Sequence, residues 1–112
     1  MPKWEIIYFQ SARREKLVKS FIDEQDLRIK GKYVGMIGFL SEYGPFLTEK
    51  YTKKIRNDLY EIRITGKEQI RVLYAVRGNK IILLHAFKKK TQKVPEKEIK
   101  VALLRLRALN AY

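Results

Sequence analysis

Hydrophobic and polar positions along the first half of the chain predict one strand followed by two helices. The short aromatic and β-branched run Trp4–Phe9 is typical of a strand. Apolar residues at helical spacing then predict a helix over Ala12–Leu27, with Ser11 as its N-cap. A second helix is predicted over Lys32–Glu42, because Gly44-Pro45 follows it directly and is typical of a helix end.

The second half of the chain predicts a small antiparallel sheet and a last helix. Pro45–Asp58 is basic and weakly patterned, and we expect a loop there. Residues rich in strand formers, separated by short turns at Gly66 and Gly78-Asn79, then predict consecutive antiparallel strands. These strands are Leu59–Thr65, Gln69–Arg77 and Lys80–Lys88. Pro95 opens an amphipathic final helix.

The predicted order is β-α-α-β-β-β-α, which defines an α+β fold with a small antiparallel sheet, two N-terminal helices and a C-terminal helix. The chain has 112 residues, a length that suits one domain with one modest core. No Pro/Gly/Ser-rich linker, internal repeat or low-complexity tract divides it. We therefore expect residues 1–112 to form a single domain.

Composition excludes several functional classes. The chain lacks cysteine, so it has no disulfide framework, thiolate zinc site or thiol nucleophile, and its single histidine makes a His-rich metal site unexpected. It has neither an apolar run long enough to span a membrane nor a signal-peptide pattern, so we expect a cytoplasmic protein without a membrane partner.

The charge balance points to a polyanionic partner. Twenty-five Lys and Arg residues against twelve Asp and Glu residues give a formal net charge of +13. A field of this sign attracts phosphate polyanions and accelerates their encounter with the protein. A surface that serves solubility alone usually mixes both signs more evenly, so the charge favours contact with nucleic acid or the ribosome.

Alternation along the predicted strands collects charged residues on one face. Glu61 and Arg63 point to the same side of their strand, and a three-residue turn places Arg63 directly opposite Arg71 on the next. The run Lys88–Lys90 follows at the end of the last strand. Two guanidiniums, a carboxylate and several ammoniums on one patch suit a phosphodiester. The alternative is a set of cross-strand ion pairs on a solvated face.

His85, the only histidine, lies in the last predicted strand. Alternation places it on the same face as Leu83 and Phe87. It is a candidate proton-transfer group or, alternatively, a half-buried structural histidine. Tyr60 and Tyr74 have apolar neighbours, and we expect both in the core.

The stretches Leu59–Ile64, Ile70–Val76 and Leu84–Lys93 resemble the RelE/HigB toxin superfamily, and in particular the phage-derived HigB-like branch of type II toxin–antitoxin systems. The resemblance implies a RelE-like, microbial-RNase-like fold and an mRNA interferase that enters the ribosomal A site. The implied reaction is attack of an RNA 2′-hydroxyl on the adjacent phosphate, so this endoribonuclease needs no metal or cofactor, and DNA is inert.

The resemblance also implies roles for individual residues. Arg71 matches a strand arginine that contacts the scissile phosphate, and Arg63 matches a position that stabilises the transition state. Glu61 is either a base or the partner of Arg63. Lys89 and Lys90 fall, with Lys88, where relatives carry catalytic His, Tyr or Arg, and His85 is a further candidate. RNA binding is assigned to the remaining basic positions near the site: Lys50, Lys53, Lys54, Lys88 and Lys93.

The same resemblance implies a protein partner. Such toxins are neutralised by a cognate antitoxin, here expected to be a helix-turn-helix HigA-like protein, and bind operator DNA only through it. The alternative function is a catalytically inactive RNA- or ribosome-binding module on the same fold.

Overall fold

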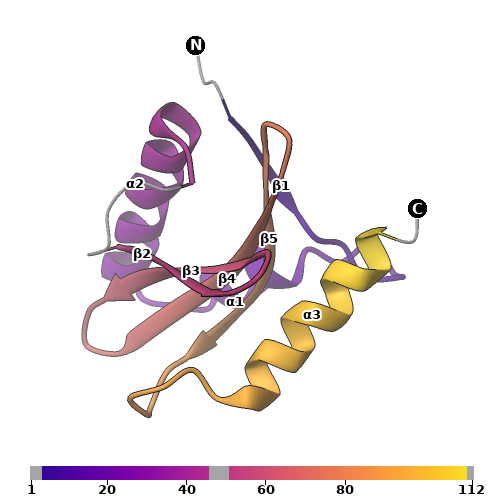
Figure 1. The fold of residues 1–112 in the computed structure, drawn as a ribbon. Coiled ribbons are helices and arrows are strands. Elements are labelled where there is room, and N and C mark those ends of the chain that lie inside the picture. The colour runs from indigo at the N-terminus through magenta and orange to yellow at the C-terminus, as the bar shows by residue number, and fades with distance from the viewer. Residues whose placement is uncertain (1–3, 46–50, 111–112) are drawn as a thin grey trace.

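The computed structural model describes residues 4–45 and 51–110, and its centre is a five-stranded sheet (Figure 1). The strands lie in the order β1-β5-β4-β3-β2, with β1 parallel to β5 and the other neighbours antiparallel. The elements in chain order are β1 (Glu5–Tyr8), α1 (Leu17–Asp23), α2 (Leu27–Tyr43), β2 (Thr52–Arg56), β3 (Leu59–Thr65), β4 (Gln69–Arg77), β5 (Lys80–Lys88) and α3 (Glu96–Asn110). The predicted α+β class, its three helices and the bounds of β3, β4 and β5 are confirmed, but the sheet is mixed rather than antiparallel, because β1 pairs with β5 in parallel.

The sheet separates two apolar layers. Helices α1 and α2 pack on one face, where Val18, Leu40 and Ile62 belong to one buried cluster. Helix α3 packs on the other face through Ile99 and Ala102 (Figure 1). Tyr74 is fully buried in the first layer and donates a hydrogen bond to the Pro45 carbonyl, and Tyr60 stacks on it, so the core placement of both tyrosines is confirmed.

The prediction of a loop over Pro45–Asp58 is wrong in part, because Thr52–Arg56 forms strand β2 at the edge of the sheet. Thr52 is buried and Ile55 half-buried, but the remaining positions are exposed lysines and an arginine. Charged side chains are common on edge strands, where they oppose pairing with another chain. They also hide the alternating pattern by which a strand is recognised.

The predicted starts of the first two helices are also wrong, and the first helix ends at Asp23 rather than at the predicted Leu27. Residues 11–16 form a turn in which Ser11 Oγ accepts a hydrogen bond from the Glu15 amide, and α1 begins only at Leu17. Helix α2 begins at Leu27, capped by Asp26, whose carboxylate accepts a hydrogen bond from the Ile29 amide. This cap explains why the helix starts before Gly31 rather than after it.

The predicted end of α2 is confirmed. Gly44 has φ 99°, which a residue with a Cβ rarely adopts, and ends the helix. A Cβ here would lie 2.9 Å from Trp4 Nε1, so the tryptophan packs against the glycine backbone. None of the described helices has the length and apolar character needed to cross a membrane.

A bulge in β5 corrects the predicted alternation around His85. Leu73 pairs with His85, but Tyr74 pairs with Leu83, so Leu84 is an extra residue. Leu83 therefore joins the core beneath α1 and α2, whereas His85 and Phe87 lie on the α3 face.

Candidate functional site

A charged cluster lies on the α3 face of the sheet, where β2, β3 and β4 run side by side. The turn between β3 and β4 has three residues, so Arg63 lies directly opposite Arg71, as predicted. Lys53 on β2 pairs with Glu61 on β3 and therefore shares its face. We call Lys53, Glu61, Arg63, Arg71 and Lys89 the charged cluster.

Glu61 is the centre of this cluster. Its side chain is only 2% exposed, and its Oε1 accepts a hydrogen bond of 3.0 Å from Arg63 Nε. Its Oε2 lies 3.6 Å from Arg71 Nε, close enough for an ion pair but too long for a hydrogen bond. Glu61 Oε2 and Arg71 Nε are both buried, and within the described part of the chain neither atom has a hydrogen-bond partner. One carboxylate thus holds two guanidiniums side by side.

The two arginines differ in accessibility. The Arg71 side chain is 9% exposed and that of Arg63 is 30% exposed. Arg71 NH1 donates hydrogen bonds of 3.1 Å to Gln69 Oε1 and to the Ile70 carbonyl. Burial lowers the pKa of the Arg71 guanidinium, Glu61 opposes that shift and Arg63 adds to it. Arginine nevertheless stays charged in proteins, so Arg71 contributes a fixed buried cation.

Lys89 is the lysine of the Lys88–Lys90 run that joins the cluster. Its amide donates a hydrogen bond to the Gln69 carbonyl, which continues the pairing of β4 and β5. Burial lowers the pKa of its amine, and the positive charge of Arg71 lowers it further. Arg63 and Lys53 act in the same direction, while Glu61 opposes them. Lys89 therefore releases its proton more readily than an isolated lysine.

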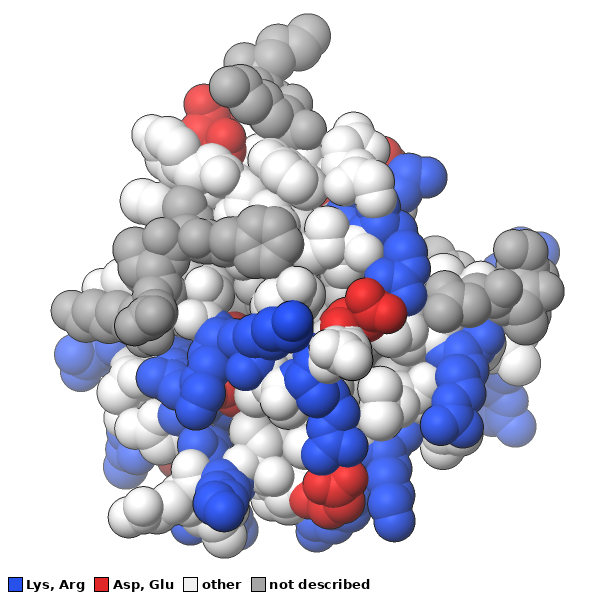
Figure 2. Space-filling view, in the orientation of Figure 1, with Lys and Arg blue, Asp and Glu red and all other residues white. Residues whose placement is uncertain are grey.

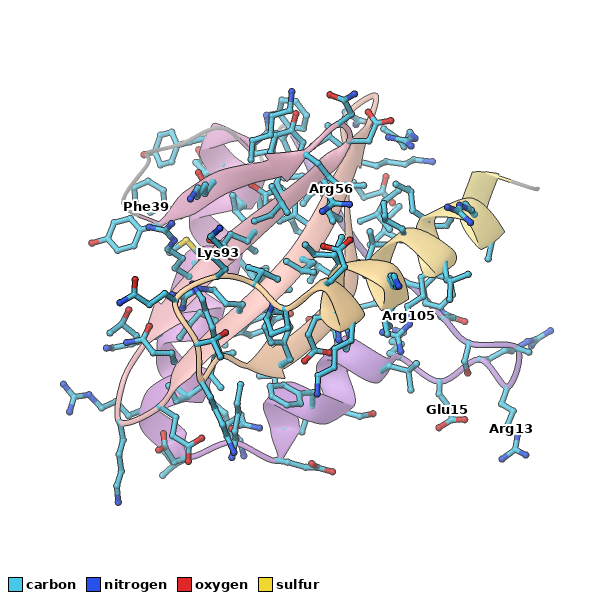
Figure 3. The ribbon with its side chains drawn as sticks, turned by 60° about the horizontal axis from the view of Figure 1, so that its bottom comes forward. Arg13, Glu15, Phe39, Arg56, Lys93 and Arg105 are labelled. Atoms are coloured by element: carbon cyan, nitrogen blue, oxygen red, sulfur yellow. The ribbon has the colours of Figure 1, made fainter. Side chains whose placement is uncertain are left out.

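The structure separates the other predicted lysines. Lys88 pairs with Ile70 on the opposite face and forms an ion pair of 3.1 Å with Glu68. Lys54 pairs with Tyr60 and also points to the α2 side of the sheet. Lys90 is exposed beyond the end of β5. Lys93 is exposed on the loop from β5 to α3, in front of the sheet in Figure 3. Lys50 lies outside the described residues.

His85 lies apart from the charged cluster, between β5 and α3. Its Nδ1 lies 3.3 Å from Arg105 NH1, and its Nε2 lies 2.9 Å from Glu98 Oε1. Since an arginine can only donate, Nδ1 accepts, and the ring proton on Nε2 is donated to Glu98. Burial lowers the pKa of the imidazole; Glu98 opposes this shift and Arg105 reinforces it. We call His85, Glu98 and Arg105 the α3 clamp.

Several residues in and around these two groups have roles that the sequence does not predict. For Lys53 the sequence predicts only RNA binding from a loop, because the pattern of β2 is hidden. Gln69, which orients Arg71, has no distinguishing pattern in the sequence. Glu98 and Arg105 lie seven residues apart along α3 and therefore on one face of the helix. This spacing is the feature of the sequence that indicates a shared environment for the two side chains.

The charged cluster suits an anion with several oxygens. It holds four cationic side chains around one carboxylate, and lysine and arginine side chains also gather over much of the lower half of the face seen in Figure 2. Guanidiniums bind phosphate oxygens through directed N–H groups, and ammoniums add charge without a fixed geometry. Within residues 4–45 and 51–110, no group of three or more His, Asp or Glu side chains is placed to hold a metal ion.

Sequence comparison identifies the family. The family model described as phage derived protein Gp49-like matches residues 20–107. The chain belongs to the Gp49-like family. The match begins in the middle of α1, covers α2 and all of β2 to β5, and ends within α3. It therefore includes both the charged cluster and the α3 clamp. No curated protein matches the sequence significantly.

Proposed function

We propose that this Gp49-like protein is the toxin of a type II toxin–antitoxin system and acts as a ribosome-dependent mRNA endoribonuclease of the RelE/HigB superfamily. The observation that carries the proposal is the pairing of two arginines across one buried carboxylate, with Lys89 beside them. Membership of a phage-derived family and the resemblance of Leu59–Lys93 to the superfamily support the same assignment.

The proposed reaction is a transesterification within RNA. The 2′-hydroxyl oxygen forms a bond to the adjacent phosphorus, the bond from phosphorus to O5′ breaks, and the products are a 2′,3′-cyclic phosphate and a 5′-hydroxyl. A base must take the proton of the 2′-hydroxyl and an acid must protonate O5′. The phosphorane-like transition state carries extra negative charge, which nearby cations stabilise.

Accessibility divides the roles of the cluster residues. Arg63 is the guanidinium that reaches solvent, so it contacts the phosphate oxygens directly. Arg71 lies beneath it and strengthens the positive field at the same point. Lys89, whose amine has a lowered pKa and interacts electrostatically with both arginines, is the proton-transfer group in this proposal. The α3 clamp engages both nitrogens of His85, so in this proposal His85 is structural.

Glu61 acts as a positioning residue in this proposal. Its two oxygens face Arg63 and Arg71, and its side chain is 2% exposed, so a 2′-hydroxyl has little access to it. By contacting both guanidiniums through Nε, the carboxylate compensates the repulsion between them and fixes their separation.

Induced expression in bacteria tests the proposal. Wild-type protein is expected to arrest growth and to produce new mRNA 5′ ends within translated codons, whereas Arg63→Ala and Lys89→Ala abolish both effects. Lys88→Ala is the matched control, because it neighbours Lys89 but points to the opposite face. Normal growth and intact messages in cells that contain soluble, folded wild-type protein would exclude the proposed toxin function.

The second candidate function, a catalytically inactive RNA- or ribosome-binding module, is favoured by the absence of a histidine from the charged cluster. For such a module, Arg63→Ala only weakens association and lowers the salt dependence of binding by about one phosphate contact. Message cleavage that depends on Arg63 decides between the two functions.

The proposed partners follow from the same assignment. The substrate is mRNA in the ribosomal A site, and a cognate antitoxin, expected to be a helix-turn-helix HigA-like protein, neutralises the toxin in the cytoplasm. Operator DNA is bound through the antitoxin.

A further inference from the structure

Helix α2 exposes large apolar side chains to solvent. Four of the six exposed large hydrophobic residues in the described structure lie on this helix: Leu27 is 84% exposed, Val34 68%, Phe39 53% and Tyr43 66%. Phe39 and Tyr43 contact each other with ring centroids 4.9 Å apart, and Phe39 lies at the margin of the molecule on the side away from α3 (Figure 3). Contiguous apolar surface of this kind marks sites of association.

Three glycines lie between these side chains on the outward side of α2. A Cβ added to Gly31, Gly35 or Gly38 would meet no atom within 4 Å, so the protein's own packing does not require a glycine at any of them. Glycine is among the least favourable residues in a helix interior. Because glycine has no side chain, another backbone can approach this part of the helix closely. The outer face of α2 consists of Leu27, Gly31, Val34, Gly35, Gly38, Phe39 and Tyr43.

The charges beside this face favour an acidic occupant. Arg28 and Lys32 are exposed along one side of α2, and Glu42 is the one acidic residue within the helix. The whole chain carries +13. A second copy would place like charges against one another, whereas a partner with Asp and Glu at the edges of an apolar stripe is complementary.

A pocket lies between α2 and the end of β3. It is lined by residues from α2, β3 and the segment before β2: Lys32, Met36, Tyr51, Arg63, Ile64 and Thr65. Lys32 Nζ donates a hydrogen bond to the Thr65 carbonyl across it. Lys32 is an exposed cation at this pocket, so an acidic side chain of a partner bound to α2 can pair with it.

We propose that the outer face of α2 is the docking site for an amphipathic helix of the partner protein, with an apolar stripe, acidic edges and a carboxylate that pairs with Lys32 at the pocket. The identification of this partner as the neutralising antitoxin rests on the proposed function.

Calorimetric titration with the cognate antitoxin tests this proposal. Val34→Glu is expected to weaken binding by about 30-fold or more, since it buries a charge at the centre of the contact. Leu104→Glu is the matched control: Leu104 is 62% exposed on α3, and its replacement leaves binding unchanged. Both positions are exposed, so circular dichroism and urea unfolding should show native folds.

A second variant separates binding from stability. Gly35→Leu places a good helix former in open space, so the melting temperature should stay equal or rise. Its side chain occupies the surface that the partner needs, and affinity should fall by about 10-fold or more. Opposite changes in stability and affinity support a docking surface.

Three results overturn the proposal. They are wild-type affinity in both Val34→Glu and Gly35→Leu, absence of binding between the wild-type chain and the cognate antitoxin, and sedimentation of the chain alone as a dimer that Val34→Glu dissociates. The last result would assign the face to a second copy. Binding is measured without RNA cleavage, so failure of the proposed nuclease activity is seen separately.

Discussion

The α3 face of the sheet carries two polar groups that differ in charge balance. In the charged cluster, one carboxylate faces four cations, whereas in the α3 clamp one carboxylate and one arginine flank a neutral imidazole. Arg105 also donates a hydrogen bond of 2.7 Å to the Leu84 carbonyl, so the side chains of the clamp find their hydrogen-bond partners within the protein.

This difference separates a structural group from a functional one. Hydrogen bonding within the α3 clamp compensates its burial, and nothing about its charge requires an external partner. The charged cluster keeps excess positive charge near a buried carboxylate, an arrangement that costs stability unless an anion binds. The comparison predicts that removing a cation from the cluster impairs activity, whereas removing a hydrogen-bond partner from the clamp impairs folding.

The largest expected effect is on RNA cleavage. Arg63→Ala should lower the rate of ribosome-dependent cleavage by about 100-fold or more, because it removes a cation aimed at the transition state. Arg105→Ala should instead lower the free energy of unfolding by about 1–2 kcal/mol, through its lost hydrogen bonds, and keep near-wild-type cleavage. Primer extension on a translated message and urea unfolding measure the two effects. Equal loss of cleavage in both variants would contradict the division.

The second effect is on stability within the charged cluster. Glu61→Gln removes the negative charge that faces both arginines and should lower the free energy of unfolding by about 3 kcal/mol. The matched variant in the clamp is Glu98→Gln, whose partner His85 is neutral, so its loss should be about 1 kcal/mol. Urea unfolding at neutral pH measures both. A smaller loss for Glu61→Gln than for Glu98→Gln would show that the arginines do not depend on the carboxylate.

The sequence predicts the arginine pair but not its surroundings. The three-residue turn determines the register of β3 and β4, and this local feature suffices to place Arg63 opposite Arg71. The position of Lys53 beside Glu61 depends on β2, an edge strand whose lysines conceal its pattern. The environment of His85 depends on a bulge in β5 and on side chains of α3 far along the chain, which local periodicity does not encode.

A third effect concerns pH. Because burial lowers the pKa of His85 in the folded state below its ordinary value of 6.5, the unfolded chain takes up the proton more readily. The stabilisation that neutral His85 gives the folded protein is complete above pH 6.5 and is lost as the pH falls toward the pKa of His85 in the folded state. Urea unfolding at several pH values should therefore show wild-type protein losing more stability on mild acidification than His85→Gln. Parallel pH profiles for the two proteins would contradict this assignment.

The smallest effect distinguishes neighbouring lysines. Only a neutral amine reacts with an acylating reagent, so Lys89, whose pKa is lowered by burial and by Arg71, should be acetylated faster than Lys88. Lys88 is the internal reference, because it lies next in sequence and is paired with Glu68. Mass spectrometry of briefly acetylated protein measures both sites in one sample.

The Arg71→Ala variant then tests the cause of the lowered pKa. Removing this guanidinium takes away the largest charge-based contribution that lowers the pKa of Lys89, so the acetylation of Lys89 should slow toward that of Lys88. Arg105→Ala, which changes the α3 clamp alone, should leave the ratio of the two rates unchanged. If instead Lys89 reacts no faster than Lys88 in wild-type protein, the charged cluster does not activate its amine, and the proton-transfer role passes to another group.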